Sequence, residues 1–337
     1  MQTCDTLLHA GVLLTQDDDR RVLENAALAI DGGRIVALGY SQDVTAAWQA
    51  REILDLSGML VMPGLVNAHT HAAMTFLRGL ADDMPLMDWL QQKIFPVEQG
   101  LTPDLVRLGS LLGFAEMLRT GTTSCVDMYI FEAAVLEAAD KAGLRCLAGE
   151  GVFNFPSACC PDADAALACT REMAQRWAGH DRLHVAVMPH SVYTTTAAQL
   201  TACRELADEL GLPLHIHLAE TRQETALSLE QHGLRPVAHA DRLGLLRPGT
   251  ILAHVVDVDA DEIALLARRG VSVVHNPSSN MKLASGVAPV PAMLDAGVRL
   301  ALGSDGAASN NNLNMLEEVT LASMIGKGIT GDPTFLG

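Results

Sequence analysis

Basic side chains are scarce in this sequence. Lysine and arginine total 23 against 40 aspartates and glutamates, which gives a formal net charge of −17. A surface of this sign repels a phosphate backbone and offers no basic stripe. The composition therefore argues against a nucleic-acid partner.

Long apolar runs are also missing. The N-terminal stretch "MQTCDTLLHAGVLLTQDDDR" has no basic region followed by an apolar segment, as a secretory signal would. No later stretch approaches the roughly 20 uninterrupted apolar residues of a membrane span. We therefore expect a soluble, cytoplasmic protein with no membrane partner.

Cysteine pairing motifs are absent as well. The seven cysteines form an odd set without a C-x-x-C pair, a pattern that favours reduced thiols over a disulfide framework or a thiolate zinc site. Adjacent Cys159 and Cys160 are interpreted as part of a polar loop rather than as a ligand pair. The sequence also lacks the glycine-rich motifs G-x-G-x-x-G and G-x-x-x-x-G-K-[ST] after any expected strand, so nucleotide-phosphate binding by those routes is unsupported.

What the sequence does contain is material for a large core. Of its 337 residues, 49% are hydrophobic and 19% are charged, which argues against disorder. An α/β barrel alone commonly occupies roughly 250 residues. The length therefore suits one barrel and an accessory unit.

The accessory unit is expected at residues 1–62. Its apolar runs "TLLHAGVLLT", "AALAI" and "RIVALG" read as short strands, and the last two are joined by Asp31-Gly32-Gly33. Glycines at this point permit the positive φ of a tight hairpin. We interpret residues 1–62 as the N-terminal part of a composite β-sandwich.

From residue 63 to 337, short apolar runs alternate with longer segments of helical periodicity. This alternation is typical of repeated βα units with a parallel sheet. Capping signals support the helices: Thr102 caps one that begins at Pro103, and Gly211 follows another. The pattern predicts a (β/α)8 barrel in preference to an open doubly wound sheet, with strands near 64–69, 122–127, 145–150, 183–190, 212–220, 250–255, 271–276 and 298–305.

Histidines and acids stand where these strands should end. Because the loops that leave the carboxyl ends of barrel strands build the active site, such side chains should converge. His69 and His71 lie two apart and so point to the same side of their strand. Buried imidazoles around a carboxylate would cost desolvation energy unless a cation or substrate paired with them. The predicted metal ligands are His69, His71, His217 and Asp305.

This nitrogen-rich ligand set suits one divalent ion, zinc first and ferrous iron second, rather than magnesium. His215 is expected to fill a deeper layer, and His254 to lie beside the ligands. Only four lysines exist, and none stands at the end of the fourth strand, "MPHS", where two-metal barrels often carry a bridging modified lysine. One metal is therefore predicted.

Four motifs in order, "PGLVNAHTH", "HIHLAET", "HNPSSNMKLASG" and "LGSDGAASNN", resemble the amidohydrolase superfamily. The resemblance is to its deaminases and chlorohydrolases of purines and s-triazines, and it runs from about residue 5 to the end. "MPLMDWLQQKIFPVE" is similar to the branch of 5'-methylthioadenosine/S-adenosylhomocysteine deaminases. The resemblance implies the same four metal ligands, Glu220 as a proton shuttle, and Glu98 and His190 as substrate contacts.

The implied reaction is hydrolytic deamination at C6 of an adenosine derivative. The metal would lower the pKa of water toward about 7, which supplies the nucleophile. Glu220 would protonate the ring nitrogen, Asp305 would accept the proton of the attacking water, and His254 would orient it. The product would be the inosine form and ammonia.

The sequence departs in two features from the family that it resembles. Members place an arginine after the third strand, where this chain has "GEGVFNFPSACC", so recognition of a homocysteine carboxylate is in doubt. They also continue beyond an end such as "GDPTFLG" into a segment that completes the N-terminal β unit. We expect a fragment or shortened chain whose strand edges favour association, including a homo-oligomer.

Two other functions remain open at this point. A related s-triazine or guanine aminohydrolase or chlorohydrolase would use the same metal, but Glu98 favours a substrate with ribose hydroxyls. A catalytically inactive metal-binding barrel would have no need of Glu220.

Overall fold

A computed structural model describes residues 1–336 of the chain. These residues form two compact units, Met1–Gly64 and a larger one that begins at Leu65. Each unit is described by itself. The division into a β-sandwich part at residues 1–62 and a barrel at residues 63–337 stays a prediction.

The smaller unit is a four-stranded sheet in the order β3-β2-β1-β4. β1 pairs antiparallel with β2, which pairs antiparallel with β3, whereas β1 and β4 are parallel. Gly32 and Gly33 adopt φ of 55° and 74° between β2 and β3, as the hairpin requires. The fourth strand and a short helix before it were not predicted. The elements are β1 (Gln2–Leu14), β2 (Val22–Asp31), β3 (Arg34–Tyr40), α1 (Ser41–Ala47) and β4 (Trp48–Val61).

The larger unit is a ring of parallel strands, and all eight predicted strand positions carry strands. The fourth and eighth positions are each divided into two short strands. Both strands of the fourth position pair with β7, whereas the eighth position changes its pairing partner from β12 to β5 part-way along. The strands are β5 (Leu65–His71), β6 (Thr122–Tyr129), β7 (Arg145–Val152), β8 (Leu183–Val185), β9 (Met188–Pro189), β10 (Leu214–Leu218), β11 (Thr250–His254), β12 (Ser272–His275), β13 (Arg299–Leu302) and β14 (Asp305–Gly306).

The divided strands close the ring. β13 pairs with β12, and β14 pairs with β5, so the last strand joins the first. On the opposite side, parallel bridges from Val187 to Leu214 and from Ser191 to His217 join the fourth position to β10. The predicted (β/α)8 barrel is confirmed.

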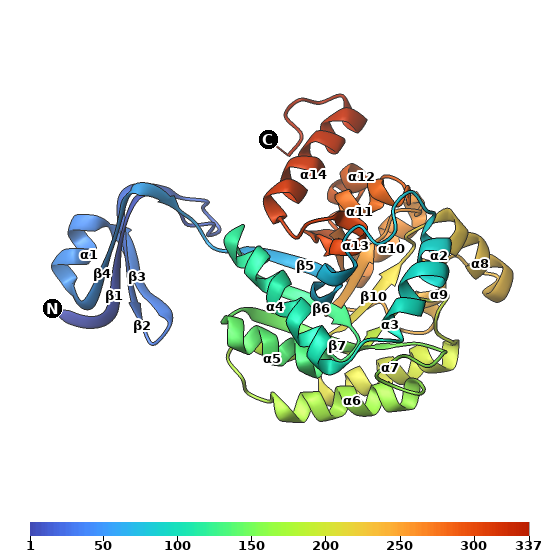
Figure 1. Ribbon diagram of the computed structural model, residues 1–337. Helices are drawn as coiled ribbons and strands as arrows, with labels where there is room; N and C mark the ends of the chain where they lie inside the picture. The colour runs from blue at the N-terminus through green and yellow to red at the C-terminus, as the bar shows by residue number, and fades with distance from the viewer. Residues whose placement is uncertain (337) are drawn as a thin grey trace. The chain divides into compact units, whose positions relative to one another are not determined.

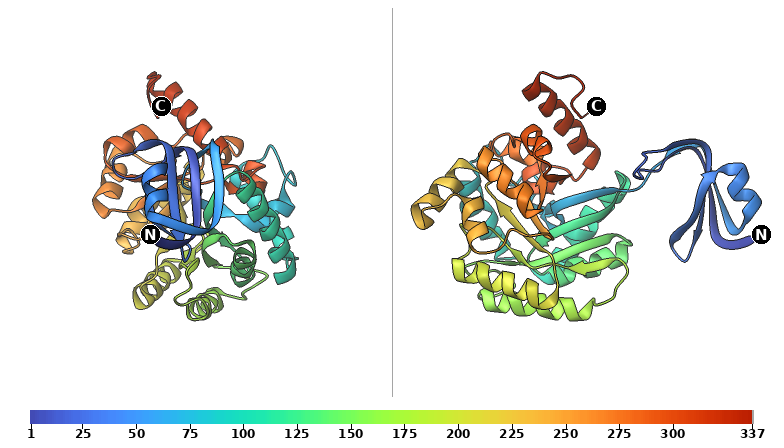
Figure 2. Two further views of the ribbon diagram at one scale, coloured as in Figure 1. Left: turned by 90° about the vertical axis from the view of Figure 1, so that its left-hand side faces the viewer. Right: turned by 180° about the vertical axis from the view of Figure 1, so that it is seen from behind.

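Helices flank the strands of this unit (Figures 1 and 2). The predicted caps are present: Thr102 accepts a hydrogen bond from the Leu105 amide, and Gly211 ends its helix in the left-handed conformation. The longer helices are α4 (Pro103–Arg119), α5 (Glu132–Ala142), α6 (Ala163–Arg176), α7 (Ala197–Leu210), α8 (Arg222–His232), α9 (Pro236–Arg242), α10 (Ala260–Arg269) and α14 (Met315–Thr330).

Short helices lie in the loops between strands and helices. They include η1 (Ala72–Leu77), α2 (Leu86–Trp89), the π-helical η2 (Leu90–Ile94), α3 (Phe95–Glu98), α11 (Pro277–Lys282), α12 (Val290–Asp295) and α13 (Ala307–Asn310). The segment from α2 to α3 follows the first strand and lies across one mouth of the barrel unit (Figure 1). It therefore brings loop residues to the strand ends.

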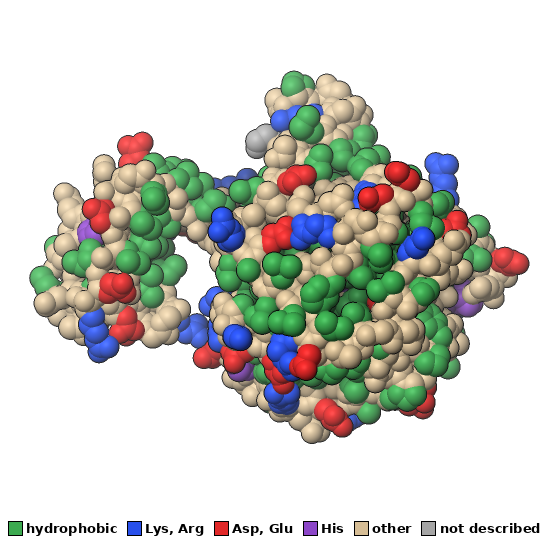
Figure 3. All heavy atoms as spheres, viewed as in Figure 1, with side chains coloured by type: hydrophobic (Ala, Val, Ile, Leu, Met, Phe, Trp, Pro, Cys, Tyr) green, Lys and Arg blue, Asp and Glu red, His purple; other side chains and the backbone are tan. Residues whose placement is uncertain are grey.

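The core lies between the strands and these helices. Every residue of β10 is buried, because one side of the strand faces the barrel axis and the other faces helices. On the outer face, α4 exposes Leu105, Leu108 and Leu112, and hydrophobic side chains gather over this face of the unit (Figure 3). Among the described residues, no helix is both long and apolar enough to cross a bilayer.

Candidate metal centre and active site

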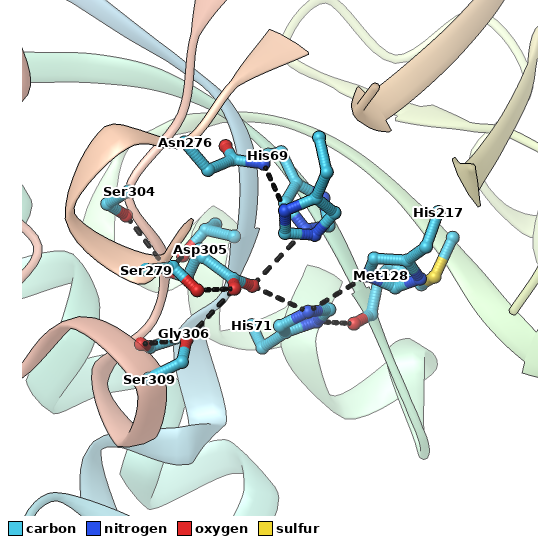
Figure 4. A network of polar contacts seen from close by, with 12 residues as sticks. His69, His71, Met128, His217, Asn276, Ser279, Ser304, Asp305, Gly306 and Ser309 are labelled. Carbon is cyan, nitrogen blue, oxygen red and sulfur yellow. Dashed lines mark hydrogen bonds and ion pairs between the residues drawn. The ribbon is translucent and has the colours of Figure 1, made fainter. Parts of the chain in front are cut away.

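The strand ends bring four imidazoles and one carboxylate together. His69 and His71 end β5, His217 lies in β10, His254 ends β11, and Asp305 begins β14. Asp305 Oδ1 lies 3.2 Å from His69 Nε2 and 3.0 Å from His71 Nε2. His71 Nε2 in turn lies 3.4 Å from His217 Nε2 (Figure 4). Residues up to 236 positions apart in the chain thus share one small volume.

Asp305 is held by hydroxyl groups on its other oxygen. Ser279 Oγ and Ser309 Oγ donate hydrogen bonds of 2.6 and 2.9 Å to Oδ2, which leaves Oδ1 directed at the histidines. Burial opposes ionisation of Asp305, but the adjacent imidazoles of His69 and His71 outweigh it and hold the pKa well below its usual range. Asp305 is therefore an anion at the centre of the cluster.

Each histidine is oriented through its Nδ1 atom. His71 Nδ1 contacts the Met128 carbonyl oxygen, and His217 Nδ1 lies 2.8 Å from the His190 carbonyl oxygen. An N–H at Nδ1 that donates to a carbonyl leaves Nε2 unprotonated, as a metal ligand requires. His254 Nδ1 is fixed in the same way, 2.9 Å from Asn280 Oδ1.

The surroundings of His69 Nε2 show whether the residues of the cluster fit a bound cation. The atom is buried and has no hydrogen-bond partner among the described residues, while Nδ1 of the same ring lies 2.8 Å from His215 Nε2. An orphaned nitrogen aimed at a carboxylate is costly unless a cation pairs with it. Imidazole nitrogens and one carboxylate are the donors that zinc takes in three- or four-residue sites. The residues therefore fit one divalent metal, and zinc suits them best.

Two overlapping ligand sets are present. His69, His217, His254 and Asp305 offer donor atoms that all lie within 4.8 Å of one another. The predicted set contains His71 in place of His254, and His71 is in reach of both Asp305 and His217 as measured above. The assignment of His71 as ligand and of His254 as the residue that orients the nucleophile stays a prediction.

The backbone is strained where the strands end. Ala219, His254 and Asp305 adopt φ of 53°, 74° and 60°, in the left-handed region that residues with a Cβ rarely occupy. Each such residue costs about 1–3 kcal/mol and persists only where its surroundings impose it. The strain directs His254 and Asp305 inward from the ends of β11 and the divided eighth strand.

Glu220 lies beside the histidine cluster. Its Oε1 accepts a 3.0 Å hydrogen bond from Ser285 Oγ, and its Oε2 lies 3.7 Å from His254 Nε2. The backbone amides of Ala219 and Glu220 donate to the buried carboxylate of Glu224 at 2.9 and 2.7 Å, which fixes this turn. Burial raises the pKa of Glu220, so the carboxyl group is disposed to carry a proton.

A pocket joins the cluster to the predicted substrate contacts. Glu98 and His190 both line it, together with His71, His217, Glu220, His254 and Asp305. Burial raises the pKa of Glu98 to about 7, although the neighbouring Tyr129 hydroxyl opposes the shift. Burial also lowers the pKa of His190 to about 3, so this imidazole is neutral. The rest of the lining is apolar or aromatic, from Met74, Leu86, Trp89, Leu90, Ile94, Phe95, Met128, Tyr129, Ile130, Gly151, Phe153, Tyr193 and Leu283.

Sequence reasoning missed the residues that position these groups. Ser279, Asn280 and Ser285 lie in the quoted motif "HNPSSNMKLASG", and Ser309 lies in "LGSDGAASNN". These residues could have been found from the sequence, because they lie in the same motifs as a predicted ligand or a predicted strand end. Tyr129 and Glu224 carried no such signal, since an acid or tyrosine near a strand end is common without a role.

The sequence profile of the amidohydrolase family matches residues 60–334. The chain is 61% identical to the 5-methylthioadenosine/S-adenosylhomocysteine deaminase of Desulfovibrio desulfuricans over 336 residues, which cover 100% of this chain and 76% of the relative. It is 55% identical to the protein of the same name from Lawsonia intracellularis over 335 residues, 99% of this chain and 76% of that relative.

Solved structures give a consistent comparison. A zinc-bound adenosine deaminase from Xanthomonas campestris superposes with a TM-score of 0.97 at 42% identity, covering 100% of this chain and 77% of that one. A zinc complex of atrazine chlorohydrolase from Arthrobacter aurescens gives a TM-score of 0.89 at 24% identity, over 98% of this chain and 78% of its own. The second similarity concerns the fold alone.

Proposed function

The chain belongs to the amidohydrolase family, and on this basis we propose that it is a zinc-dependent hydrolase that removes the 6-amino group of adenosine derivatives. The observation that carries the proposal is one pocket that is lined by Glu220, by Glu98 and by three histidines of the cluster, His71, His217 and His254. The names of the relatives at 61% and 55% identity agree with this reaction. The substrates we propose are 5'-methylthioadenosine, adenosine and S-adenosylhomocysteine.

A divalent cation bound at this site supplies Lewis-acid activation of water at neutral pH. The four residues proposed to hold it are His69, His71, His217 and Asp305. The remaining chemistry belongs to side chains of the chain itself. Asp305, which is anionic, accepts the proton of the attacking water, and His254 donates or accepts a hydrogen bond that orients this water over C6.

Glu220 supplies the proton that the ring must gain. When C6 becomes tetrahedral, N1 of the purine takes a proton, and a carboxyl group with a raised pKa is suited to deliver it. Ser285 holds one oxygen of Glu220, so the other is free to face the ring. The proton that Asp305 took from the water can then pass to the departing amine, which leaves as ammonia, and Glu220 regains its proton from the hydroxyl group on C6.

Glu98 and the apolar lining select the substrate. A buried carboxyl group on α3 can accept hydrogen bonds from ribose hydroxyls, which a bare guanine or an s-triazine lacks. The lining within residues 1–336 contains no lysine or arginine to pair with a homocysteine carboxylate. We therefore expect methylthioadenosine and adenosine to be deaminated with higher kcat/KM than S-adenosylhomocysteine.

The setting of this reaction follows from composition. With a formal charge of −17, we propose that the partner is the small-molecule substrate alone, in the cytoplasm and without nucleic acid or membrane. Self-association through the strand edges of the smaller unit is a further expectation, which a measured mass in solution would test.

The test is ammonia release from each candidate substrate by protein of known zinc content. Adenosine derivatives should be turned over, whereas guanine and an aminotriazine should not. Glu220→Gln should keep its zinc and lose turnover by about 100-fold or more. Turnover of the triazine alone would favour an s-triazine hydrolase. No ammonia release from a folded protein with a full complement of zinc would favour a catalytically inactive barrel.

A further inference from the structure

Three thiols lie together away from the histidine cluster. Cys159 and Cys160 lie in the loop that follows β7, and Cys169 lies in the middle of α6, which is labelled beside β7 and α5 in Figure 1. Their sulfur atoms all lie within 4.8 Å of one another. None of the three takes part in the proposed deamination.

The spacing of the sulfurs matches that of a metal site. Cys160 Sγ and Cys169 Sγ are 3.7 Å apart. Zinc–thiolate bonds of about 2.3 Å in a tetrahedron place neighbouring sulfurs about 3.8 Å apart. Three converging sulfurs on a loop and a helix therefore need only small adjustments to hold one ion.

A carboxyl group lies beside the thiols. The buried carboxyl group of Glu150 lies next to Cys159 and accepts hydrogen bonds from the amides of Phe131 and Glu132 at 3.1 and 3.0 Å. Cysteine binds a metal as the thiolate, so a bound cation would displace protons from these sulfurs.

The thiols are accessible through a cavity. Cys159 and Cys169 line it, as do Glu150, Glu172 and Arg176. The Arg176 guanidinium does not compete for the site, because it donates to Glu137 at 2.7 Å and stacks over the Trp177 ring. Cys159 and Cys169 are half-buried and Cys160 is buried, so an ion can enter and still be shielded from water.

We propose that Cys159, Cys160 and Cys169 form a second metal site that binds one thiophilic cation, such as zinc or cuprous copper, independently of the histidine centre. Sulfur donors select soft cations, whereas the strand-end site offers nitrogen and oxygen. The sequence expectation of a polar loop at Cys159 and Cys160 considered only the adjacent pair. The third thiol joins them because α6 folds back over the loop.

Cadmium is the probe that separates this site from the first. Zinc-loaded protein, kept reduced, would be titrated with cadmium chloride while ultraviolet sulfur-to-cadmium charge-transfer absorption is recorded. We expect a band that saturates at one equivalent, since the histidine centre has no thiolate to give one. Cys169→Ala should weaken this binding by at least about 100-fold, because loss of an indirect partner alone costs 10–100-fold.

Cys125→Ala is the matched control. Cys125 and Cys146 are the other close thiol pair, 3.6 Å apart and buried, and their loss should leave the band unchanged. Circular dichroism and deaminase turnover would confirm that each variant folds. The proposal would be overturned if the band were absent from wild-type protein whose seven thiols are all reduced. A band that survives in Cys169→Ala would overturn it as well. A band lost in Cys125→Ala but not in Cys169→Ala would also overturn it by moving the site to the buried pair.

Discussion

The histidine cluster and the thiol cluster place donor atoms at similar spacings by different means. Four imidazoles and Asp305 come from the ends of different strands, and their unused nitrogens or oxygens are fixed by carbonyl, amide and hydroxyl groups. The thiols come from one loop and one helix within eleven residues, and they contact one another rather than a surrounding hydrogen-bond network.

This difference separates a site built for chemistry from one built for binding. Fixed tautomers and a strained backbone keep the strand-end donors in place before any ligand arrives, and a proton donor, Glu220, lies beside them. The buried carboxyl group beside the thiols, that of Glu150, is held by the amides of Phe131 and Glu132. We therefore expect the two centres to respond independently to substitution.

Loss of a histidine ligand should have the largest effect. His217→Ala removes a donor from the middle of the cluster, so zinc at the strand ends and deaminase turnover should both fall below detection. Metal analysis and ammonia release measure the two losses. The cadmium–thiolate band should remain in this variant, and its disappearance would show that the clusters are not independent.

The next largest effect distinguishes His71 from His254. If His71 is a ligand and His254 orients the attacking water, His71→Ala should lose zinc, whereas His254→Ala should keep zinc and lose kcat by about 100-fold. Zinc content per chain decides between them. The reverse result would assign His254 as the ligand, in agreement with the tighter grouping of its donor atom with His69 and His217.

A smaller effect is expected from the hydroxyl that holds Asp305. Ser279→Ala removes the 2.6 Å hydrogen bond to Oδ2, so zinc affinity or kcat should fall about 10–100-fold. Ser309 still donates to the same oxygen, which keeps the carboxylate in place. Competition for zinc against a chelator would measure the affinity. An unchanged affinity and kcat would mean that one hydroxyl suffices, and Ser309→Ala is the companion variant.

The smallest effect concerns a histidine that belongs to neither cluster. His239 on α9 is buried and stacks on His232 with ring centroids 3.9 Å apart, and burial, together with His232 and Arg242, lowers its pKa to about 4. Its folded pKa lies below the unfolded value of 6.5, so the unfolded chain binds more protons and stability falls as the pH falls from 6.5 to 4.

His239→Gln should remove this dependence. Over that window the free energy of unfolding of wild type should drop by up to about 1.4 kcal/mol per pH unit more than that of the variant. Urea unfolding at several pH values measures the difference. Parallel pH curves for the two proteins would contradict a buried, neutral His239.

Local sequence patterns were sufficient to predict most of the barrel. Short apolar runs of six to nine residues, separated by segments of helical periodicity, located all eight strand positions, because burial on both faces requires such runs. The pattern failed at β4, where "WQAREILDLSGMLV" mixes charged, polar and glycine residues and most side chains are exposed. A strand without a buried face leaves little periodicity to detect.

The sequence by itself determined which residues stand at the strand ends, since chain order and the period of two fix His69, His71, His217, His254 and Asp305 there. Only the tertiary structure decided which atoms meet. The hydroxyls on Asp305, the Glu224 carboxylate under Glu220 and the third thiol beside Cys160 depend on packing between separate segments, and spacing along the chain carries no record of such contacts.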